Sequence, residues 1–263
     1  MNPVIFYTTH KKEMLQNSPL YDIITHNQEL NPGYESQIYD DKRSRSFIKS
    51  EYDNVILECF DKLIPGAYRA DLIRLLLLYR YGGTYIDVGL KLQHPLPRIN
   101  EDKSLVLVKD LPHNQFPGIY NAYMASDKGH PFIKKCIEHI VENILNEEYG
   151  IFTLDITGPT ALGRVFKEYY KNKNPKYLKL LAYRNHQIAP SNKKKKKKRA
   201  TRKQYGDRHI FYQKEICIEG KNALYLNHSK GISAVVPTQD EKNKSAFHYG
   251  TLWNLRQVFK GDI

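Results

Sequence analysis

Short apolar runs and periodically spaced apolar residues alternate at the beginning of the chain. Residues 4–9 form a short run rich in β-forming types, bounded by a proline and a polar segment, which predicts a buried strand. Residues 20–30 have helical spacing, and residues 35–39 alternate as a second strand does. The turn sequence at 31–34 separates these two elements, and Asp40 or Asp41 is placed to cap a following helix. The chain therefore begins with a predicted β-α-β-α unit.

A long helix followed by a strand is predicted in the middle of the sequence. Residues 65–81 begin with Pro-Gly and carry a broad stripe of leucine and tyrosine side chains, which favours a helix packed on a core. Gly82-Gly83 ends this helix. Residues 84–88 combine β-branched and aromatic types suited to a central strand, and residues 105–108 predict another strand.

Two amphipathic helices and scattered strand-like pieces are predicted in the second half. One helix follows His130, and another begins at Thr157-Gly-Pro159 with Thr157 as its expected N-cap. The remaining predicted elements are strand-like pieces at 186–189, 209–212 and 223–226 and a last helix over about 251–259. Strands that alternate with helices predict an α/β fold, in which helices cover both faces of a mixed sheet.

Composition supports one packed domain over residues 1–263. Apolar residues make up 41% of the sequence and aromatic residues 12%, which is typical of a globular protein with a substantial core. The three cysteines are widely spaced and odd in number, so they indicate neither a disulfide framework nor a zinc site. No stretch approaches the length of a transmembrane helix. We expect a cytoplasmic protein.

The formal net charge of +13 is concentrated in one stretch. Ten basic residues and one acidic residue lie between Lys193 and Arg208, so +9 of the charge comes from this run and +4 from the rest of the chain. A run of like charges repels itself and stays solvated, which predicts a basic surface loop at about 190–208. Contact with an anionic surface such as phospholipid or nucleic acid, or attraction of an anionic substrate, remains an alternative. No specific nucleic acid is expected, because the run contains a single aromatic residue, Tyr205, and matches no recognised nucleic-acid-binding module.

A carboxylate, a guanidinium and a second carboxylate form the strongest chemical pattern. Asp71 and Arg74 are three residues apart on the predicted helix, so they share one face. Together they suit a polar ligand, since a carboxylate accepts from sugar hydroxyls and a guanidinium binds phosphate oxygens. A structural ion pair is the alternative. Asp87 ends an apolar strand, and open α/β sheets place ligand sites at the carboxyl ends of strands.

The glycine pair before this strand has two interpretations. Gly82 and Gly83 permit backbone conformations that are closed to other residues and allow a ligand to approach closely. A simple helix C-cap, which needs one glycine, is the alternative.

These segments resemble a known family, the DXD-containing GT-A glycosyltransferases of the Gly_transf_sug type (glycosyltransferase family 32), which include fungal α-mannosyltransferases and bacterial capsular enzymes. The resemblance is dense over residues 1–97 and thinner afterwards. The matching segments are Asn31-Pro-Gly-Tyr34, Ile38-Tyr-Asp-Asp41, Ile64-Pro-Gly-Ala67, Ala70-Asp71 with Arg74, Tyr81 to Asp87, Gly129-His-Pro-Phe132, Thr157-Gly-Pro159 and His248-Tyr-Gly-Thr-Leu-Trp253.

The resemblance implies a GT-A fold, a UDP- or GDP-sugar donor, Mn²⁺ or Mg²⁺, and transfer to a glycan or other hydroxyl acceptor with retention of configuration. Asp87 matches the first aspartate of the DXD motif and, with Arg74, is the expected catalytic residue. Asp71 and Arg74 match donor-binding residues, and Gly83 and Tyr85 belong to the same donor segment.

The sequence departs from the family at the end of the DXD motif. Asp87-Val88-Gly89 lacks the last carboxylate, so either other groups hold the metal with Asp87 or the metal is weak or dispensable. His248 and Thr251 are spaced as two metal-coordinating residues are in the related glucosylating toxins, and imidazole is a reasonable Mn²⁺ ligand. Trp253 is the expected contact of the leaving diphosphate, with a core aromatic as the alternative.

Four further residues are candidates with ordinary alternatives. Tyr7 and Thr8, at the nucleotide-binding end of the first strand, are assigned to the donor, with Tyr7 either stacking on the base or packing as a strand tyrosine. Asn121 and Asp155 are candidates for contact with the sugar or acceptor, or are plain loop residues. Because Gly89 removes a metal ligand, a catalytically silent nucleotide-sugar-binding protein is the alternative to a retaining glycosyltransferase.

Overall fold

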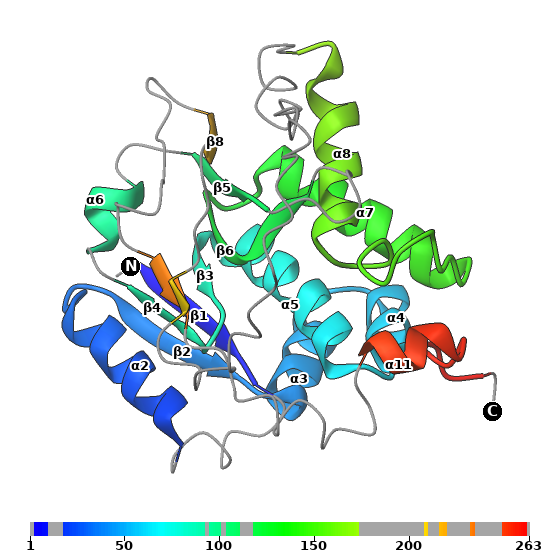
Figure 1. The fold of residues 1–263 in the computed structure, drawn as a ribbon, viewed down its shortest axis with the longest axis horizontal. Helices are drawn as coiled ribbons and strands as arrows, with labels where there is room; N and C mark the ends of the chain where they lie inside the picture. The colour runs from blue at the N-terminus through cyan, green and yellow to red at the C-terminus, as the bar shows by residue number, and fades with distance from the viewer. Residues whose placement is uncertain are drawn as a thin grey trace, which may run out of the picture.

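The computed structural model places a six-stranded mixed sheet at the centre of the protein (Figure 1). It describes residues 3–9, 18–92, 95–100, 104–110, 118–173, 208–209, 216–219, 232–234 and 249–261. The strand order is β2-β1-β3-β6-β5-β8. The bounds are β1 Val4–Thr8, β2 Glu35–Tyr39, β3 Gly83–Ile86, β5 Leu105–Lys109, β6 Ile119–Ser126 and β8 Ile216–Glu219.

Three strands of this sheet are parallel, and this decides where the site lies. β1 pairs in parallel with β2 on one side and with β3 on the other. Ile5 lies opposite Thr84, and Phe6 lies opposite Tyr85. The carboxyl ends of β1 and β3 therefore reach the same edge of the sheet, where Thr8 and Asp87 come next to each other in the register. β6 is antiparallel to β3 and brings its first residues to that edge.

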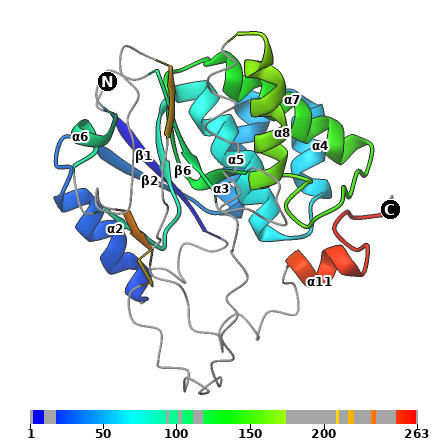
Figure 2. The ribbon, with the colours of Figure 1, turned by 45° about the horizontal axis from the view of Figure 1, so that its top comes forward.

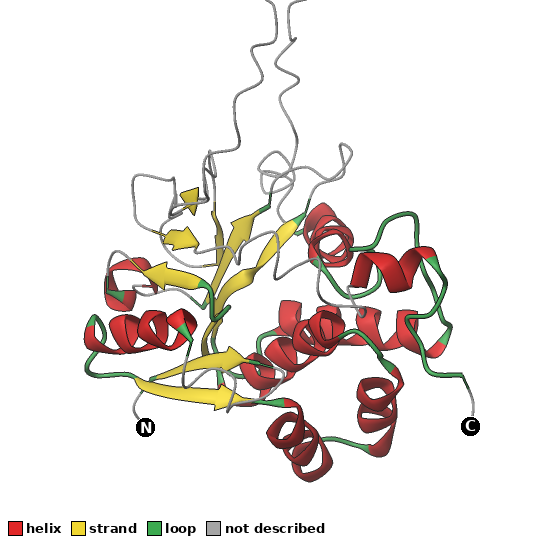
Figure 3. Ribbon diagram, turned by 60° about the horizontal axis from the view of Figure 1, so that its bottom comes forward, coloured by secondary structure: helices red, strands yellow, loops and turns green. Residues whose placement is uncertain are grey.

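Helices cover both faces of the sheet, as Figures 2 and 3 show. α2 (Pro19–Glu29) and α6 (Leu96–Asn100) lie on one face. The other face carries α3 (Asp41–Glu51), α4 (Asn54–Lys62), α5 (Gly66–Tyr81), α7 (Pro131–Leu145) and α8 (Pro159–Lys171). The predicted α/β class, with a mixed sheet between two helical layers, is confirmed.

The central helix α5 is buried on more sides than its predicted stripe implies. Leu72, Leu75 and Leu76 are fully buried as expected, and Leu77 and Leu78 are fully buried too. A helix that is apolar around most of its circumference belongs inside the protein, where it packs between the sheet and α3 and α7. This fixed position determines where the polar residues of its first two turns point.

The helix caps and ends predicted from the sequence match the structure at α3 and differ from it at α8 and α11. Asp40 accepts a hydrogen bond from the backbone N–H of Arg43 at 2.7 Å and caps α3, as predicted. Gly158, rather than Thr157, is the N-cap of α8, because the Thr157 hydroxyl bonds elsewhere. The last helix, α11, covers Tyr249–Asn254 and is shorter than predicted.

The strands of the second half show the largest difference from the sequence prediction. β6, a central strand of the sheet, has no counterpart among the predicted elements. The predicted pieces at 186–189 and 223–226 and most of the basic run at 190–208 lie outside the described residues. A second sheet, in the order β4-β9-β7, consists of Leu90–Leu92, Ile232–Ala234 and Arg208–His209. No helix among the described residues is long and apolar enough to cross a membrane.

The glycine pair serves the packing of the backbone. Gly82 and Gly83 have φ values of 71° and 101°, in the left-handed region that side chains disfavour. A Cβ on Gly83 would lie 2.7 Å from the carbonyl oxygen of Val4, and one on Gly82 would lie 2.7 Å from the backbone nitrogen of Lys128. The close approach predicted here is therefore made by neighbouring chain segments. Gly83 begins β3, whereas Asp87 follows its other end, so Gly83 lies away from the Asp87 edge.

Replacing Gly83 by alanine is expected to lower the free energy of unfolding by more than about 3 kcal/mol, the upper end of what backbone strain alone costs, because a clash with Val4 is added to the strain. Gly129 separates the two causes, since it has φ 72° but an added Cβ would meet no described heavy atom within 4 Å. Gly66 has the same open space and an ordinary φ, so Gly66→Ala is the neutral control. Urea denaturation should rank Gly83→Ala below Gly129→Ala and Gly66→Ala, and equal stability of the first two would contradict the clash.

Candidate active site

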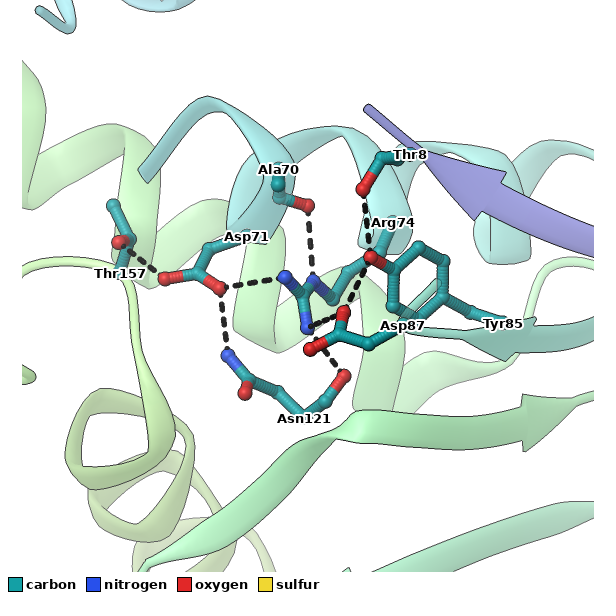
Figure 4. A network of polar contacts seen from close by, with 8 residues as sticks. All are labelled: Thr8, Ala70, Asp71, Arg74, Tyr85, Asp87, Asn121 and Thr157. Carbon is teal, nitrogen blue, oxygen red and sulfur yellow. Dashed lines mark hydrogen bonds and ion pairs between the residues drawn. The ribbon is translucent and has the colours of Figure 1, made fainter. Parts of the chain in front are cut away.

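A network of charged and polar side chains lies at the sheet edge where β1 and β3 end (Figure 4). Its members come from α5, from the ends of β1 and β3, from β6 and from the segment before α8. They are Thr8, Asp71, Arg74, Tyr85, Asp87, Asn121 and Thr157. Six of these seven residues were predicted site residues, and Thr157 was not.

Asp71 and Arg74 form a buried ion pair. A guanidinium nitrogen of Arg74 lies 3.0 Å from Oδ1 of Asp71, and the side chains of Arg74 and Asp71 are only 5% and 10% exposed, respectively. The shared helical face predicted from their spacing is therefore confirmed. Nε of Arg74 also donates to the carbonyl oxygen of Ala70 at 2.9 Å, and Nη1 donates to the carbonyl oxygen of Asn121. These contacts hold the guanidinium in one orientation.

Two neutral donors complete the surroundings of Asp71. Nδ2 of Asn121 donates to Oδ1 at 2.7 Å, and the Thr157 hydroxyl donates to Oδ2 at 2.8 Å. Burial raises the pKa of Asp71 to about 6, although Arg74 and the hydroxyl of Thr157 act in the opposite direction. A carboxylate with this pKa is mostly ionised at neutral pH, so it balances the charge of Arg74.

Asp87 is the exposed end of the network. Its carboxylate is 42% exposed, and Oδ1 lies 3.4 Å from Nη1 of Arg74. The Tyr85 hydroxyl donates to the same oxygen at 2.7 Å. The backbone of Asp87 is also held, because its N–H donates to the carbonyl oxygen of Ala122 at 2.8 Å. Asp87 therefore combines a fixed backbone with a carboxylate that a ligand can reach.

Tyr85 links Asp87 to the first strand. Its ring is fully buried and lies under the guanidinium of Arg74, with 4.5 Å between the Arg74 Cζ and the ring centroid. Burial raises the pKa of Tyr85 well above its ordinary value, so the phenol keeps its proton. The phenol donates its hydrogen bond to Asp87. The Thr8 hydroxyl, which lies 2.7 Å from the phenol oxygen, therefore donates to that oxygen.

The guanidinium of Arg74 is enclosed by groups of the protein itself. Its side chain is 5% exposed, and its nitrogens are directed to Asp71, Asp87 and two backbone carbonyl oxygens. The guanidinium therefore holds Asp87 and does not present a free face to a phosphate in this conformation. The contact of Arg74 with a donor phosphate, which the sequence suggests, stays a prediction.

Tyr7 lies away from the network. Its side chain is fully buried in the apolar cluster beneath α2, which also contains Ile24 and Ile86. Successive residues of a strand point to opposite faces, so Tyr7 faces this core while Thr8 reaches the sheet edge. The structure corrects the base-stacking role and supports the packing alternative.

The C-terminal candidates have mixed positions. Nε1 of Trp253 donates to the carbonyl oxygen of Tyr149 at 2.9 Å, so the N–H expected at the diphosphate is used within the protein. Thr251 is exposed on α11, and His248 lies outside the described residues. The start of α11 packs against the first turn of α5, because the Tyr249 ring lies 5.9 Å from that of Tyr68. Burial and the charge of Asp71 both raise the pKa of Tyr249.

Asp155 supports a loop. Its Oδ2 accepts from the backbone N–H groups of Ile151 and Phe152 and from Arg164 at 2.7 Å, and its side chain is 2% exposed. A carboxylate buried in this way is not placed to touch a sugar or an acceptor, which corrects that expectation. Asn121, the other candidate, lies within the network.

Thr157 is the residue that sequence reasoning missed as part of the site. It is fully buried, and the distance between Thr157 and Asp71 in the sequence is 86 residues. The segment Thr157-Gly-Pro159 carries a helix signal and a family resemblance, and that resemblance was the only signal that favoured a site role. Its hydroxyl contacts a donor-site candidate because the fold brings the segment before α8 next to Asp71 of α5.

The residues present fit part of a divalent metal site. Both contacts that the described residues make with the Asp87 carboxylate involve Oδ1, so Oδ2 keeps its lone pairs for a ligand. Mg²⁺ is commonly held by one or two carboxylates together with substrate phosphates and water. In the described parts of the chain, no cluster of three or more His, Cys, Asp or Glu side chains forms a complete protein site. Asp87 therefore suits a metal shared with a bound diphosphate.

Comparison with known proteins supports the resemblance found in the sequence. Residues 8–106 match the model of the family described as "Glycosyltransferase sugar-binding region containing DXD motif". This segment contains Thr8, Asp71, Arg74, Tyr85 and Asp87. The family resemblance is thereby confirmed over this part of the chain.

Named relatives include fungal and viral proteins. Inositol phosphoceramide mannosyltransferase 3 of Schizosaccharomyces pombe is 28% identical over 144 residues, which are 54% of this chain and 39% of the relative. The uncharacterized glycosyltransferase L373 of Acanthamoeba polyphaga mimivirus is 26% identical over 147 residues, 56% of each protein. The chain thus spans about two fifths of the length of that fungal relative (39%). Among solved structures, a PaToxG glycosyltransferase matches with a TM-score of 0.47 and 16% identity, covering 68% of this chain and 73% of that chain.

Proposed function

We propose that this chain transfers a hexose from a UDP- or GDP-sugar to a hydroxyl group of a glycan or glycolipid acceptor, with retention of configuration. The observation that carries the proposal is the half-exposed Asp87 carboxylate at the carboxyl edge of the sheet, backed by the buried Arg74. The match of residues 8–106 to the DXD family supports the same reaction class. The names of the fungal relatives make mannose the first sugar to test.

The roles of the residues follow from their exposure. Asp87 is the side chain that meets the donor, because its carboxylate is reachable while its backbone is fixed. Arg74 and Tyr85 are positioning residues, since both are buried and both contact Oδ1 of Asp87. A divalent metal bound by Asp87 and the diphosphate would stabilise the charge that develops on the leaving nucleotide. The acceptor hydroxyl enters on the face from which the diphosphate leaves, in a front-side displacement.

Asp71 keeps the electrostatics of the site balanced. Arg74 carries one positive charge between two carboxylates, so the cluster of Asp71, Arg74 and Asp87 has a net charge of about −1 when all three groups are ionised. This excess negative charge lies on the exposed Asp87 and favours a cation there. An anionic diphosphate alone would be repelled, so we propose that donor binding is linked to Mn²⁺ or Mg²⁺.

Metal removal is the direct test of this linkage. With a UDP- or GDP-hexose that supports hydrolysis or transfer, EDTA is expected to reduce turnover by about 100-fold or more, because metal ions supply several kcal/mol of charge stabilisation. Adding Mn²⁺ back in excess should restore the rate, and adding K⁺ should not. Full turnover in EDTA would sink the metal proposal while leaving the transferase proposal standing.

A catalytically silent nucleotide-sugar-binding protein is the second candidate. Gly89 favours it, because the position that usually supplies the last DXD carboxylate has no side chain. A screen of nucleotide sugars by calorimetry, paired with assays of hydrolysis and transfer, separates the two functions. Turnover of any donor supports the enzyme, whereas tight binding with no turnover of any donor or acceptor supports the silent binder.

A further inference from the structure

The strand that follows Asp87 lies at the edge of its sheet. β4, Leu90–Leu92, begins three residues after Asp87 and, among the described strands, pairs with β9 alone in the order β4-β9-β7. An edge strand has one row of backbone N–H and C=O groups without a strand partner. Buried backbone groups of this kind need hydrogen bonds, because each unpaired group costs about 1 to 3 kcal/mol. Leu90 and Leu92 are both buried, so the backbone groups on this side need other partners.

Asn27 of α2 supplies these partners with its side chain. Nδ2 donates to the carbonyl oxygen of Leu90 at 2.8 Å, and Oδ1 accepts from the N–H of Leu92 at 2.8 Å. The Asn27 side chain is completely buried. A side-chain amide has the same donor and acceptor as a peptide group. Asn27 thus pairs with β4 as one residue of an additional strand would.

A second asparagine strengthens this attachment of α2. Asn31 donates from Nδ2 to the carbonyl oxygen of Asn27 at 2.7 Å, which ties the end of the helix to its own last turn. Its Oδ1 accepts from the N–H of Leu96 at 2.6 Å. Asn27 therefore fixes Leu90 and Leu92 to α2, and Asn31 fixes Leu96 to the turn that follows α2. Asn27 holds the end nearer to Asp87.

Asp87 lies between two such attachments. Its N–H donates to the carbonyl oxygen of Ala122 on β6, and its carbonyl oxygen accepts from the N–H of Leu90, both at 2.8 Å. The connection from Asp87 to Leu90 passes through Val88 and Gly89, and glycine offers little resistance to a change of backbone angle. Leu90 therefore has to be held in position by contacts with residues outside the Asp87–Leu90 turn.

We infer that Asn27 is a positioning residue for Asp87, which acts by clamping β4 and so fixing the turn that carries the catalytic carboxylate. The inference rests on the proposed function, because it assumes that Asp87 meets the donor. Loss of the clamp lets Leu90 move and shifts the carboxylate relative to a bound diphosphate. Misplacement by about 1 Å is enough to cost about 100-fold in rate.

A double-mutant cycle tests the inference. Asn27→Leu removes both amide contacts at similar volume, and Asn27→Asp keeps an acceptor for Leu92 but loses the donor to Leu90. Each is expected to lower kcat by about tenfold or more in the wild-type background and by less than about twofold in an Asp87→Asn background. UDP and GDP affinity in Mn²⁺ is measured on the same variants, and amide exchange at Leu92 reports the clamp itself. Asn31→Leu is the matched control, equally buried but farther from Asp87.

The outcomes separate the inference from the proposed function. Non-additive losses for Asn27 and Asp87, with faster exchange at Leu92 and turnover per folded molecule within about twofold for Asn31→Leu, support the inference. Additive losses, or equal losses for the two asparagine variants, overturn it and leave the transferase proposal intact. If Asp87→Asn itself changes neither turnover nor nucleotide affinity, Asp87 has no role in the reaction and the inference is overturned. If the wild-type chain turns over no nucleotide sugar, the proposed function has failed instead. If Asn27→Leu does not fold, Asn27→Asp and its exchange at Leu92 decide the question.

Discussion

Replacing Arg74 by methionine is expected to lower the free energy of unfolding by about 3 to 5 kcal/mol, the usual cost of removing one partner of a buried ion pair. Methionine fills a similar volume, so most of the loss comes from charge and hydrogen bonding. Asp71, whose side chain is 10% exposed, would keep its bonds from Asn121 and Thr157 but lose its countercharge. The carbonyl oxygens of Ala70 and Asn121 would also lose their donor.

Urea denaturation of the full chain measures this effect, with Arg45→Met as the control. Arg45 pairs with Asp61 at 2.8 Å, but those side chains are 51% and 37% exposed, so removal of this pair is expected to leave the denaturation midpoint almost unchanged. Arg74→Lys should be intermediate, because it keeps the charge but loses the planar fork of donors. Equal midpoints for Arg74→Met and Arg45→Met would show that the buried pair does not hold this part of the fold.

Replacing Asp87 by asparagine is expected to reduce turnover by about 100-fold or more, comparable to the loss of a group that stabilises transition-state charge. Asparagine has the same shape and still accepts from Tyr85, so the fold should be retained. It removes the negative charge that faces Arg74 and the proposed metal. Asp87→Glu keeps the charge but moves it by one methylene, and it should lose less activity than the asparagine variant.

Asp127→Asn is the control for this experiment. Asp127 is exposed and follows β6 at the opposite end of the sheet, beside the start of β3. Turnover of a hydrolysable nucleotide sugar, together with the denaturation midpoint, should be measured for all three variants. Wild-type turnover in Asp87→Asn would remove Asp87 from the mechanism, whatever the stability of the variant.

Some features of the site could be predicted from the spacing of residues along a single helix or strand. The separation of Asp71 from Arg74 by three residues fixes both on one helical face, and the structure has them 3.0 Å apart. Asp87 follows an apolar strand, and parallel pairing of β1 with β3 brings it to the same edge as Thr8. The geometry of one helix or one strand is enough for such statements, since it depends on the periodicity of the backbone alone.

The roles of other residues could not be predicted, because they depend on tertiary contacts that the sequence does not specify. Tyr7 and Trp253 were given donor roles, but the first is buried beneath α2 and the second donates its N–H to Tyr149. Both are aromatic residues that pack well in a core, and only their neighbours decide between packing and binding. Gly83 was interpreted as a place where a ligand comes close, whereas the close atom belongs to Val4.

By itself, the sequence determined the alternation of helices and strands, the buried helix α5, the shared face of Asp71 and Arg74, and the position of Asp87 at the end of a strand. The tertiary structure decided that Asn121 and Thr157 bond to Asp71 across separations of 50 and 86 residues, and that the guanidinium of Arg74 contacts the carboxylate of Asp87. Hydrophobic period and helix geometry act over a few residues, so they can be read from the chain. A buried carboxylate such as that of Asp71 accepts hydrogen bonds from residues far away in the sequence. The identity of these donors depends on strand register and on helix packing, which are determined only when the whole core is packed.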